Sequence, residues 1–213
     1  MNAIDEMKPG KVTAVILAGG KGRRMGGVDK GLIELDGKPL IEHVITRIRP
    51  QVDQLIISAN RNIERYQRYG YPVMTDQIKN QGPLGGILAA LQQCQSDWLL
   101  TQPCDTPYLP SDLLFRFHNT SMQTPATLYT VHDGHRSQTL FSMVHQSLAK
   151  PLQEYLDSGN RKVALWLDQQ DAICVNFSDQ PNAFVNINTN EALKNIQNKP
   201  DHFQFKEVSS HIK

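Results

Sequence analysis

The sequence predicts a three-layer αβα fold in which helices cover both faces of a mostly parallel central sheet. Short apolar runs rich in β-branched residues alternate with segments of helical periodicity, which is the pattern of parallel strands joined by crossover helices. The first apolar run leads directly into a segment rich in glycine and cations. Because open α/β sheets bind ligands beyond the carboxyl ends of their strands, the same observations predict where a ligand site lies.

Four strands and three helices are expected in the first half of the chain. The strands are expected at residues 12–17, 55–57, 71–74 and 98–101, and the helices at 41–48, 63–69 and 83–91. In the first helix, Ile41, Val44, Ile45 and Ile48 recur at helical spacing, and Pro50 ends the segment. A continuous apolar run such as 12–17 is typical of a parallel strand that is buried on both faces.

The second half of the chain predicts one antiparallel pair. Strands at 126–131 and 139–144 flank a turn at 132–136 that contains Asp133-Gly134. The remaining elements are helices at 113–118, 151–157 and 161–169, a strand at 172–177, and an extended segment at 183–190 that enters a terminal helix at 191–196. We expect one domain over residues 12–197, a loose N-terminus over 1–11 and a mobile tail over 198–213.

Composition excludes several classes of function. The chain has 213 residues, of which 39% are hydrophobic, so it can bury one sizeable core. Its formal net charge of +1 gives no electrostatic reason to expect nucleic acid or an anionic membrane as a partner. No apolar run approaches the ~20 residues of a membrane span, and residues 1–11 lack the apolar core of a signal peptide. The cytoplasm is therefore the expected compartment, and the three scattered cysteines are expected to be reduced.

The segment over residues 17–31 is the first candidate site. It reads LAGGKGRRMGGVDKG and combines six glycines with four cations. Glycines let backbone N–H groups approach a ligand closely, and the cations place positive charge where phosphates would lie. The segment contains neither GxxxxGK[ST] nor GxGxxG, because Met25 stands where the latter needs its third glycine. A nucleotide is the predicted ligand, and a flexible charged surface loop is the alternative.

Polar residues at other strand ends are the next candidates. Asp105, between Pro103 and Pro107, is suited to hold Mg²⁺ with phosphate oxygens and water, although it could instead cap the following helix. Asp76 ends another strand and is either a ligand contact or a cap. Gly82 opens a helix with Pro83 in its first turn, which suits either an anion site or a tightly packed helix start.

The extended segment near the end of the predicted domain offers a further candidate pair. Asn186 and Asn188 alternate along it, so both side chains lie on one side. Their amides could hydrogen-bond the edge of a heterocycle, or they could satisfy buried backbone groups or cap the terminal helix.

Five motifs, in order along residues 12 to about 197, resemble one family. They are LAGGxxxRMGGxDKG followed by GKPL at 37–40, then GPLxG, PCDTP, GNRKV and FVNxNT. Together they are similar to the molybdopterin nucleotidyltransferases, and the GGxDKG continuation most resembles the molybdenum cofactor guanylyltransferases among them. The resemblance implies a Rossmann-like nucleotidyltransferase fold whose N-terminal half binds GTP and whose C-terminal half binds molybdopterin.

The resemblance also implies a reaction, in which the terminal phosphate of molybdenum-molybdopterin attacks the α-phosphate of GTP and displaces pyrophosphate. Arg24, Lys30 and Asp105 are implied as catalytic, with Asp105 holding Mg²⁺. The substrate-binding positions implied are Leu17, Ala18, Gly19, Gly20, Lys30, Ser58, Asn60, Asp76, Gly82, Asp105, Arg161, Lys162, Asn186 and Asn188. GTP and molybdenum-molybdopterin are the expected partners, with transient contacts to cofactor-biosynthesis or molybdoenzyme-maturation proteins.

Two departures and two alternatives accompany this resemblance. The chain has Ser137-Gln138 where the family commonly has a His-Pro pair, and Ser58 where relatives often have Asn, so a serine hydroxyl or Asn60 takes that role. Arg161 and Lys162, at a predicted helix start, are either the site for the pterin phosphate or solvated surface charges. A cytidylyltransferase or sugar-phosphate nucleotidyltransferase is the nearer alternative function, and a non-catalytic nucleotide-binding regulatory module is the other.

Overall fold

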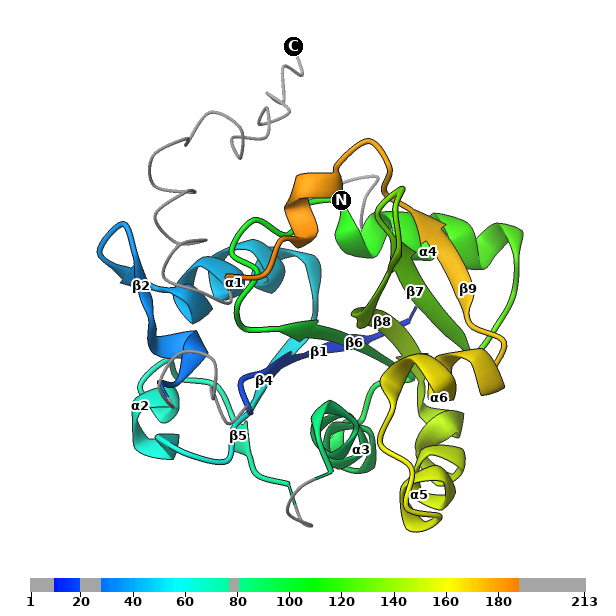
Figure 1. Ribbon diagram of the computed structural model, residues 1–213, viewed down its shortest axis with the longest axis horizontal. Helices are drawn as coiled ribbons and strands as arrows, with labels where there is room; N and C mark the ends of the chain where they lie inside the picture. The colour runs from blue at the N-terminus through cyan, green and yellow to red at the C-terminus, as the bar shows by residue number, and fades with distance from the viewer. Residues whose placement is uncertain (1–9, 20–27, 77–80, 188–213) are drawn as a thin grey trace.

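The computed structural model describes residues 10–19, 28–76 and 81–187, and its centre is a seven-stranded sheet (Figure 1). The strand order is β5-β4-β1-β6-β8-β7-β9, and β8 is the one strand of this sheet that runs antiparallel to its neighbours. The strands are β1 (Val12–Leu17), β2 (Glu34–Leu35), β3 (Lys38–Pro39), β4 (Gln54–Ser58), β5 (Val73–Met74), β6 (Trp98–Pro103), β7 (Leu128–His132), β8 (Ser137–His145) and β9 (Ile173–Asn176). The mostly parallel sheet predicted from the sequence is confirmed.

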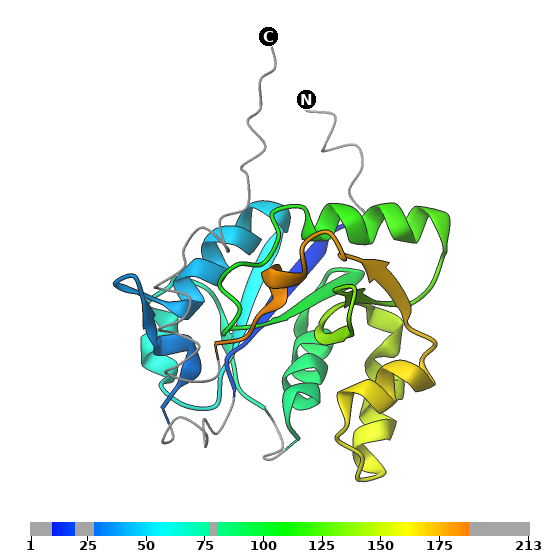
Figure 2. The same ribbon diagram turned by 45° about the horizontal axis from the view of Figure 1, so that its top comes forward.

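Helices cover both faces of this sheet. They are α1 (Leu40–Ile48), α2 (Ile63–Gln67), α3 (Pro83–Gln93), α4 (Leu113–Gln123), α5 (Ala149–Asp157) and α6 (Val163–Gln169), with 3-10 turns η3 (Lys30–Leu32), η4 (Arg49–Gln51), η5 (Gln146–Leu148) and η6 (Pro181–Phe184). Figures 1 and 2 show α1 and α4 on one face and α3, α5 and α6 on the other. The three-layer arrangement is therefore also confirmed.

The buried strand β1 packs against the helices on both faces of the sheet. Every residue of β1 is buried, and the side chains alternate between two hydrophobic clusters. Ala14 and Ile16 pack on the face of α1 and α4, whereas Val15 and Leu17 pack on the face of α3. An extended backbone points successive side chains to opposite faces, so a strand with apolar side chains on both faces, as here at all positions but Thr13, must be covered twice.

Several predicted boundaries were wrong for identifiable reasons. Helix α2 ends at Gln67 because the chain turns at Gly70, which has a φ of +77°. The segment predicted as extended from residue 183 instead begins in η6, since Pro181 starts a 3-10 turn. Helix α6 begins at Val163 rather than at residue 161. The sequence analysis also missed the two-stranded β2-β3 hairpin, whose strands are too short to show a period.

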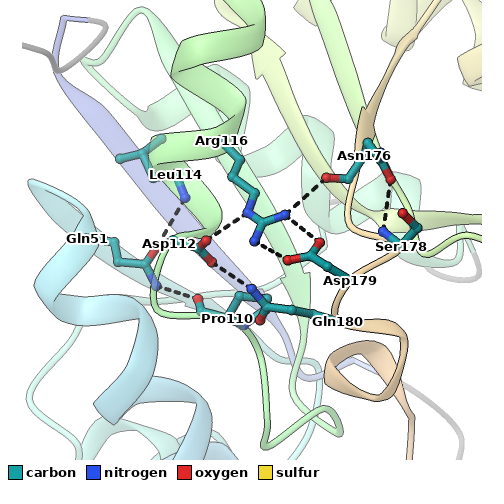
Figure 3. A network of polar contacts seen from close by, with 9 residues as sticks. All are labelled: Gln51, Pro110, Asp112, Leu114, Arg116, Asn176, Ser178, Asp179 and Gln180. Carbon is teal, nitrogen blue, oxygen red and sulfur yellow. Dashed lines mark hydrogen bonds and ion pairs between the residues drawn. The ribbon is translucent and has the colours of Figure 1, made fainter. Parts of the chain in front are cut away.

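A polar network fastens the last described segment to the fold (Figure 3). Arg116 of α4 donates to both carboxylate oxygens of Asp179 at 2.7 Å and to Asp112 at 2.7 Å. Its guanidinium also lies 4.7 Å from the ring centroid of Phe177. Two parallel N–H···O bonds fix the orientation of the Asp179 carboxylate as well as its position. The loop before η6 is thereby held against α4.

No helix within the described ranges is long and apolar enough to span a membrane.

Arg116→Gln should destabilise the protein by about 0.5–1 kcal/mol at neutral pH, an amount reduced because Asp179 is more than half exposed. The hydrogen bonds from Arg116 lower the pKa of Asp179. The stabilisation is therefore complete above the ordinary aspartate pKa of about 4 and is lost as the pH falls through the lower folded value. Urea unfolding at pH 7 and pH 3 measures both effects, and the difference between wild type and variant should shrink at pH 3.

Lys150→Gln is the control, because the Lys150–Glu154 pair is 4.0 Å long and exposed at both ends. It should change the free energy of unfolding little at either pH. An Arg116→Gln deficit that is as large at pH 3 as at pH 7 would contradict the assignment to Asp179.

Candidate active site

The site is built where the central strands of the sheet end. In the sheet register Leu17 at the end of β1 pairs with Ser58 of β4 on one side and with Pro103 of β6 on the other. Two backbone hydrogen bonds extend the pairing of these three strands by one residue beyond their ends. Ala18 N–H donates to the Ser58 carbonyl at 2.8 Å, and Cys104 N–H donates to the Leu17 carbonyl at 3.2 Å. The glycine-rich segment therefore starts between the β4 and β6 ends.

Lys30 and Asp105 meet at this edge although 75 positions separate them in the sequence. Lys30 Nζ donates to Asp105 Oδ2 at 3.1 Å. The Asp105 side chain is 6% exposed, and that of Lys30 is 29% exposed. Helix α4 begins only at Leu113 after Asp112, so the alternative in which Asp105 caps that helix is wrong. A buried carboxylate with a lysine beside it can hold a metal ion and a phosphate next to each other.

The Asp105 backbone is held from a second direction. Ile187 N–H donates to the Asp105 carbonyl at 2.9 Å, and Ile187 packs in a small apolar cluster with Leu35 and Leu40. Asn186 is half-buried beside this contact, so the segment predicted from FVNxNT does pass next to Asp105. Asn188 lies outside the described residues.

Asn60 and Asp76 pair at the ends of β4 and β5. Asn60 Nδ2 donates to Asp76 Oδ2 at 2.8 Å, and Asp76 N–H donates to Asn60 Oδ1 at 2.9 Å. Burial raises the pKa of Asp76, and the hydrogen bond from Asn60 partly opposes that shift. A Cβ on Gly19 would lie 3.2 Å from Asn60 Nδ2, so the start of the glycine-rich segment touches this pair. The arrangement connects three of the predicted positions.

The first turn of α3 approaches the same edge. Gly82 precedes it with a φ of +64°, and Pro83 occupies the first helical position, as predicted. A Cβ on Gly86 would lie 2.5 Å from Ser58 Oγ, and one on Gly85 would lie 3.4 Å from Asp76 Cγ. The glycines therefore let the helix start lie directly against the β4 and β5 ends. Ser58 is buried in that contact.

The predicted positions in the second half are less closely gathered. The Arg161 guanidinium donates to the Leu156 and Asn160 carbonyls, at 2.6 and 2.5 Å, and so binds the end of α5. Lys162 precedes α6 and is exposed. Helix α5 packs on α3, and α6 packs on β8. No hydrogen bond or ion pair within the described ranges joins Arg161 or Lys162 to Lys30 or Asp105.

After the β7-β8 turn, Ser137-Gln138 stand where the resembled family commonly has a His-Pro pair. Gln138 Nε2 donates to Asp133 Oδ2 at 2.5 Å, and the His135 and Arg136 amides donate to Asp133 Oδ1 at 2.8 Å. Burial alone would raise the pKa of Asp133, but these hydrogen bonds outweigh it and hold that pKa below its usual value. Gln138 therefore fastens the turn, and the turn predicted at Asp133-Gly134 is confirmed.

The sequence analysis missed Asp29 as a structural anchor of the site. Its carboxylate is buried and accepts hydrogen bonds from Tyr66 Oη at 2.5 Å and Asn62 Nδ2 at 2.9 Å. Burial, together with the nearby Cys104 and Asp29, raises the pKa of Tyr66 well above its usual value. The signal that could have found it is that Asp29 is the single acid among six cations over residues 8–30.

Gly20 and Arg24, like Asn188, are predicted positions that lie outside the described residues. Within the described part of the chain, no group of three or more His, Cys, Asp or Glu side chains could hold a metal ion. A single carboxylate such as that of Asp105 can hold Mg²⁺, since this ion is commonly bound through one or two carboxylates together with substrate phosphates and water.

A lysine facing a buried carboxylate at the strand ends of a mostly parallel sheet fits an α/β nucleotidyltransferase, and the family match identifies this class. The chain belongs to the family of the MobA-like NTP transferase domain, whose sequence model matches residues 14–173.

Named relatives cover nearly the whole chain. Proteins named molybdenum cofactor guanylyltransferase from Shewanella loihica and Shewanella putrefaciens are 45% and 47% identical over 187 and 184 residues. These alignments cover 87% and 86% of this chain, and 95% and 94% of the relatives. The chain therefore matches almost the whole length of these relatives.

Solved structures share the fold. Molybdopterin-guanine dinucleotide biosynthesis protein A from Archaeoglobus fulgidus superposes with a TM-score of 0.75 at 23% identity, over 89% of this chain and 99% of that one. A nucleotidyl transferase from Methanothermobacter thermautotroptrophicus gives 0.70 at 21% identity, over 91% and 97%.

Gly86→Ala should lower the free energy of unfolding by about 1–3 kcal/mol, because the added methyl group would overlap Ser58 Oγ. The sign is informative, since alanine in place of glycine otherwise favours a helix by about 1 kcal/mol. Urea unfolding measures the change. Adding Ser58→Ala should recover much of the loss because it removes the oxygen, with Ser58→Ala alone as the control. A Gly86→Ala protein as stable as wild type would contradict the close approach.

Proposed function

We propose that the protein transfers GMP from GTP to the terminal phosphate of molybdenum-molybdopterin, which gives the guanine dinucleotide form of the cofactor and pyrophosphate. The observation that carries the proposal is the Lys30–Asp105 pair, 3.1 Å apart at the carboxyl edge of the central strands. The names of the relatives, at 45–47% identity over almost their whole length, supply the choice of substrates.

The proposed reaction proceeds without a covalent enzyme intermediate. Leu17, Ala18, Gly19 and Gly20 line the nucleotide in this proposal, but the Ala18 N–H is already bonded to the Ser58 carbonyl at 2.8 Å, so the amides that follow it are the ones assigned to the nucleotide. Arg24 and Lys30 contact the phosphates and the leaving group. Positioning and neutralisation of charge supply most of the catalysis in reactions of this kind. Mg²⁺, when bound, neutralises charge on the phosphate oxygens and orients the leaving group.

The ion pair suggests how the site changes when nucleotide binds. In the structure the Asp105 carboxylate has Lys30 as a partner. With nucleotide, Asp105 would hold Mg²⁺ and the Lys30 ammonium would turn to the phosphates, so each charge exchanges one partner for another. The buried carboxylate then never lacks a counter-charge, which matters because an unpaired buried charge is strongly unfavourable.

The remaining assignments belong to the same proposal. Ser58, Asn60, Asp76 and Gly82 lie near the nucleotide. Asn186, Asn188, Arg161 and Lys162 serve the pterin. Both carbonyl bonds of Arg161 are made by Nη1, so its other guanidinium N–H groups can still donate to a phosphate, as can the Lys162 ammonium. We also propose that the N-terminal half binds GTP, that the C-terminal half binds molybdopterin, and that the enzyme acts in the cytoplasm, with transient contacts to proteins that make or use the cofactor.

Pyrophosphate release by the purified protein, with Mg²⁺ and molybdenum-molybdopterin, should occur with GTP and not with CTP or ATP. Release with CTP would instead identify a cytidylyltransferase. Replacing molybdopterin with sugar phosphates tests the other acceptor class. Binding of GTP without release of pyrophosphate with any of these acceptors would contradict the enzymatic proposal and favour a regulatory module.

Asp105→Asn should raise the Mg²⁺ concentration needed for half-maximal activity by at least about tenfold, because even changes beyond the direct ligands weaken metal binding about 10–100-fold. The measurement is initial rate against Mg²⁺ concentration at saturating GTP. Asp53→Asn is the matched control, since Asp53 accepts a hydrogen bond from Val12 N–H at the opposite end of β1. An unchanged Mg²⁺ requirement in Asp105→Asn would remove this residue from the metal site.

A further inference from the structure

Asp29 is a buried carboxylate directly before the lysine of the candidate site. Its side chain is 4% exposed. Tyr66 Oη donates to one carboxylate oxygen at 2.5 Å, and Asn62 Nδ2 donates to the other at 2.9 Å. Arg61 Nε lies 3.7 Å from that second oxygen. Donors from one short stretch, residues 61–66, therefore surround an acid that is 32 or more positions away in the sequence.

The partners of Asp29 are themselves rigidly placed. Tyr66 is fully buried in the cluster that contains Ile16, Ile57 and Cys104. Asn62 has a φ of +50°, a left-handed conformation that asparagine tolerates better than most residues. Arg61 Nη2 also donates to the Val28 carbonyl at 2.9 Å, one residue before Asp29. These contacts fix both the backbone and the carboxylate at the end of the glycine-rich segment.

Gly31 fixes the chain on the other side of Lys30. A Cβ at Gly31 would lie 2.7 Å from Tyr66 Oη and 3.2 Å from Cys104 Sγ. Only glycine, which has no side chain, can lie this close to Cys104, the residue that precedes Asp105. Lys30 is therefore flanked by two anchored residues, Asp29 and Gly31, and both contact Tyr66.

We propose that Asp29, held by Tyr66 and Asn62, is a positioning residue that sets where the Lys30 ammonium lies relative to Asp105. The Asp29 carboxylate is enclosed by Tyr66, Asn62 and Arg61, so it is assigned a positioning role and no contact with substrate. It acts through Lys30, whose backbone it anchors from one side while the Gly31–Cys104 contact anchors it from the other. The catalytic consequence rests on the proposed function, in which Lys30 contacts the transferring phosphates.

The test removes one hydroxyl group. Tyr66→Phe keeps the ring in the core but deletes the donor to Asp29. Tyr129→Phe is the matched control, since Tyr129 is a buried tyrosine whose hydroxyl bonds the Thr124 and Ala126 backbone away from the site. Thermal unfolding of both variants shows whether the two substitutions affect stability similarly. Steady-state kinetics of GMP transfer then separate kcat from KM.

Tyr66→Phe should lower kcat by about tenfold, within the range that a small misplacement of a catalytic group produces, while Tyr129→Phe leaves kcat unchanged. The decisive measurement is a double-mutant cycle with Lys30→Ala. If Tyr66 acts through Lys30, adding Tyr66→Phe to Lys30→Ala should change kcat by less than about twofold. Equal losses in the two backgrounds, or no loss in either, would overturn the positioning role.

A second readout needs no catalysis. In protein labelled with ¹⁵N-lysine, the Lys30 ammonium resonance, assigned by its loss in Lys30→Ala, should shift in Tyr66→Phe and not in Tyr129→Phe. An unshifted Lys30 signal in Tyr66→Phe would count against the proposal. If wild type releases no pyrophosphate with any nucleotide but the Lys30 signal shifts as expected, the proposed function fails and the positioning of Lys30 stands.

Discussion

The register of β1 between β4 and β6 is the constraint on which the rest of the site depends. Parallel strands end at the same edge of a sheet, and here Leu17 pairs with both Ser58 and Pro103. The segments that follow these three residues must therefore leave the sheet side by side. That places the glycine-rich segment next to Asn60 on one side and Asp105 on the other. A one-residue change of register would also exchange the two buried faces of β1, which its apolar packing on both sides opposes.

Buried aspartates carry much of the organisation at this edge, and each is stabilised differently. Asp105 has the Lys30 ammonium, Asp29 has a tyrosine hydroxyl and an asparagine amide, and Asp133 has a glutamine and two backbone amides. Asp29 also has the Arg61 guanidinium 3.7 Å away, so several fixed donors enclose this carboxylate and it anchors the chain. The Asp105 carboxylate is paired with the partly exposed Lys30 side chain and could exchange that partner for a metal ion. This difference separates the structural role of Asp29 from the catalytic role proposed for Asp105.

The second half of the chain closes on the first through its last described residues. Arg116 holds the loop at Asp179, η6 follows, and Ile187 then donates to the Asp105 carbonyl. The backbone of the proposed metal ligand is thus supported by a segment that also carries a candidate pterin contact, Asn186.

The sequence by itself determined the layers, the mostly parallel sheet, the glycine-rich segment and the candidate residues Lys30 and Asp105, because hydrophobic period and residue chemistry are local properties. It did not determine where η6 replaces an extended segment, or that Arg161 binds the end of α5, because a short 3-10 turn and a single side-chain bond to a nearby carbonyl leave no periodic signal in the sequence. Whether Asp105 caps the following helix was undecided until the structure placed the start of α4 at Leu113, after Asp112. Only the tertiary structure decided that Asp29, one acid among cations, is buried against Tyr66, because a long-range contact has no periodic signal in the chain.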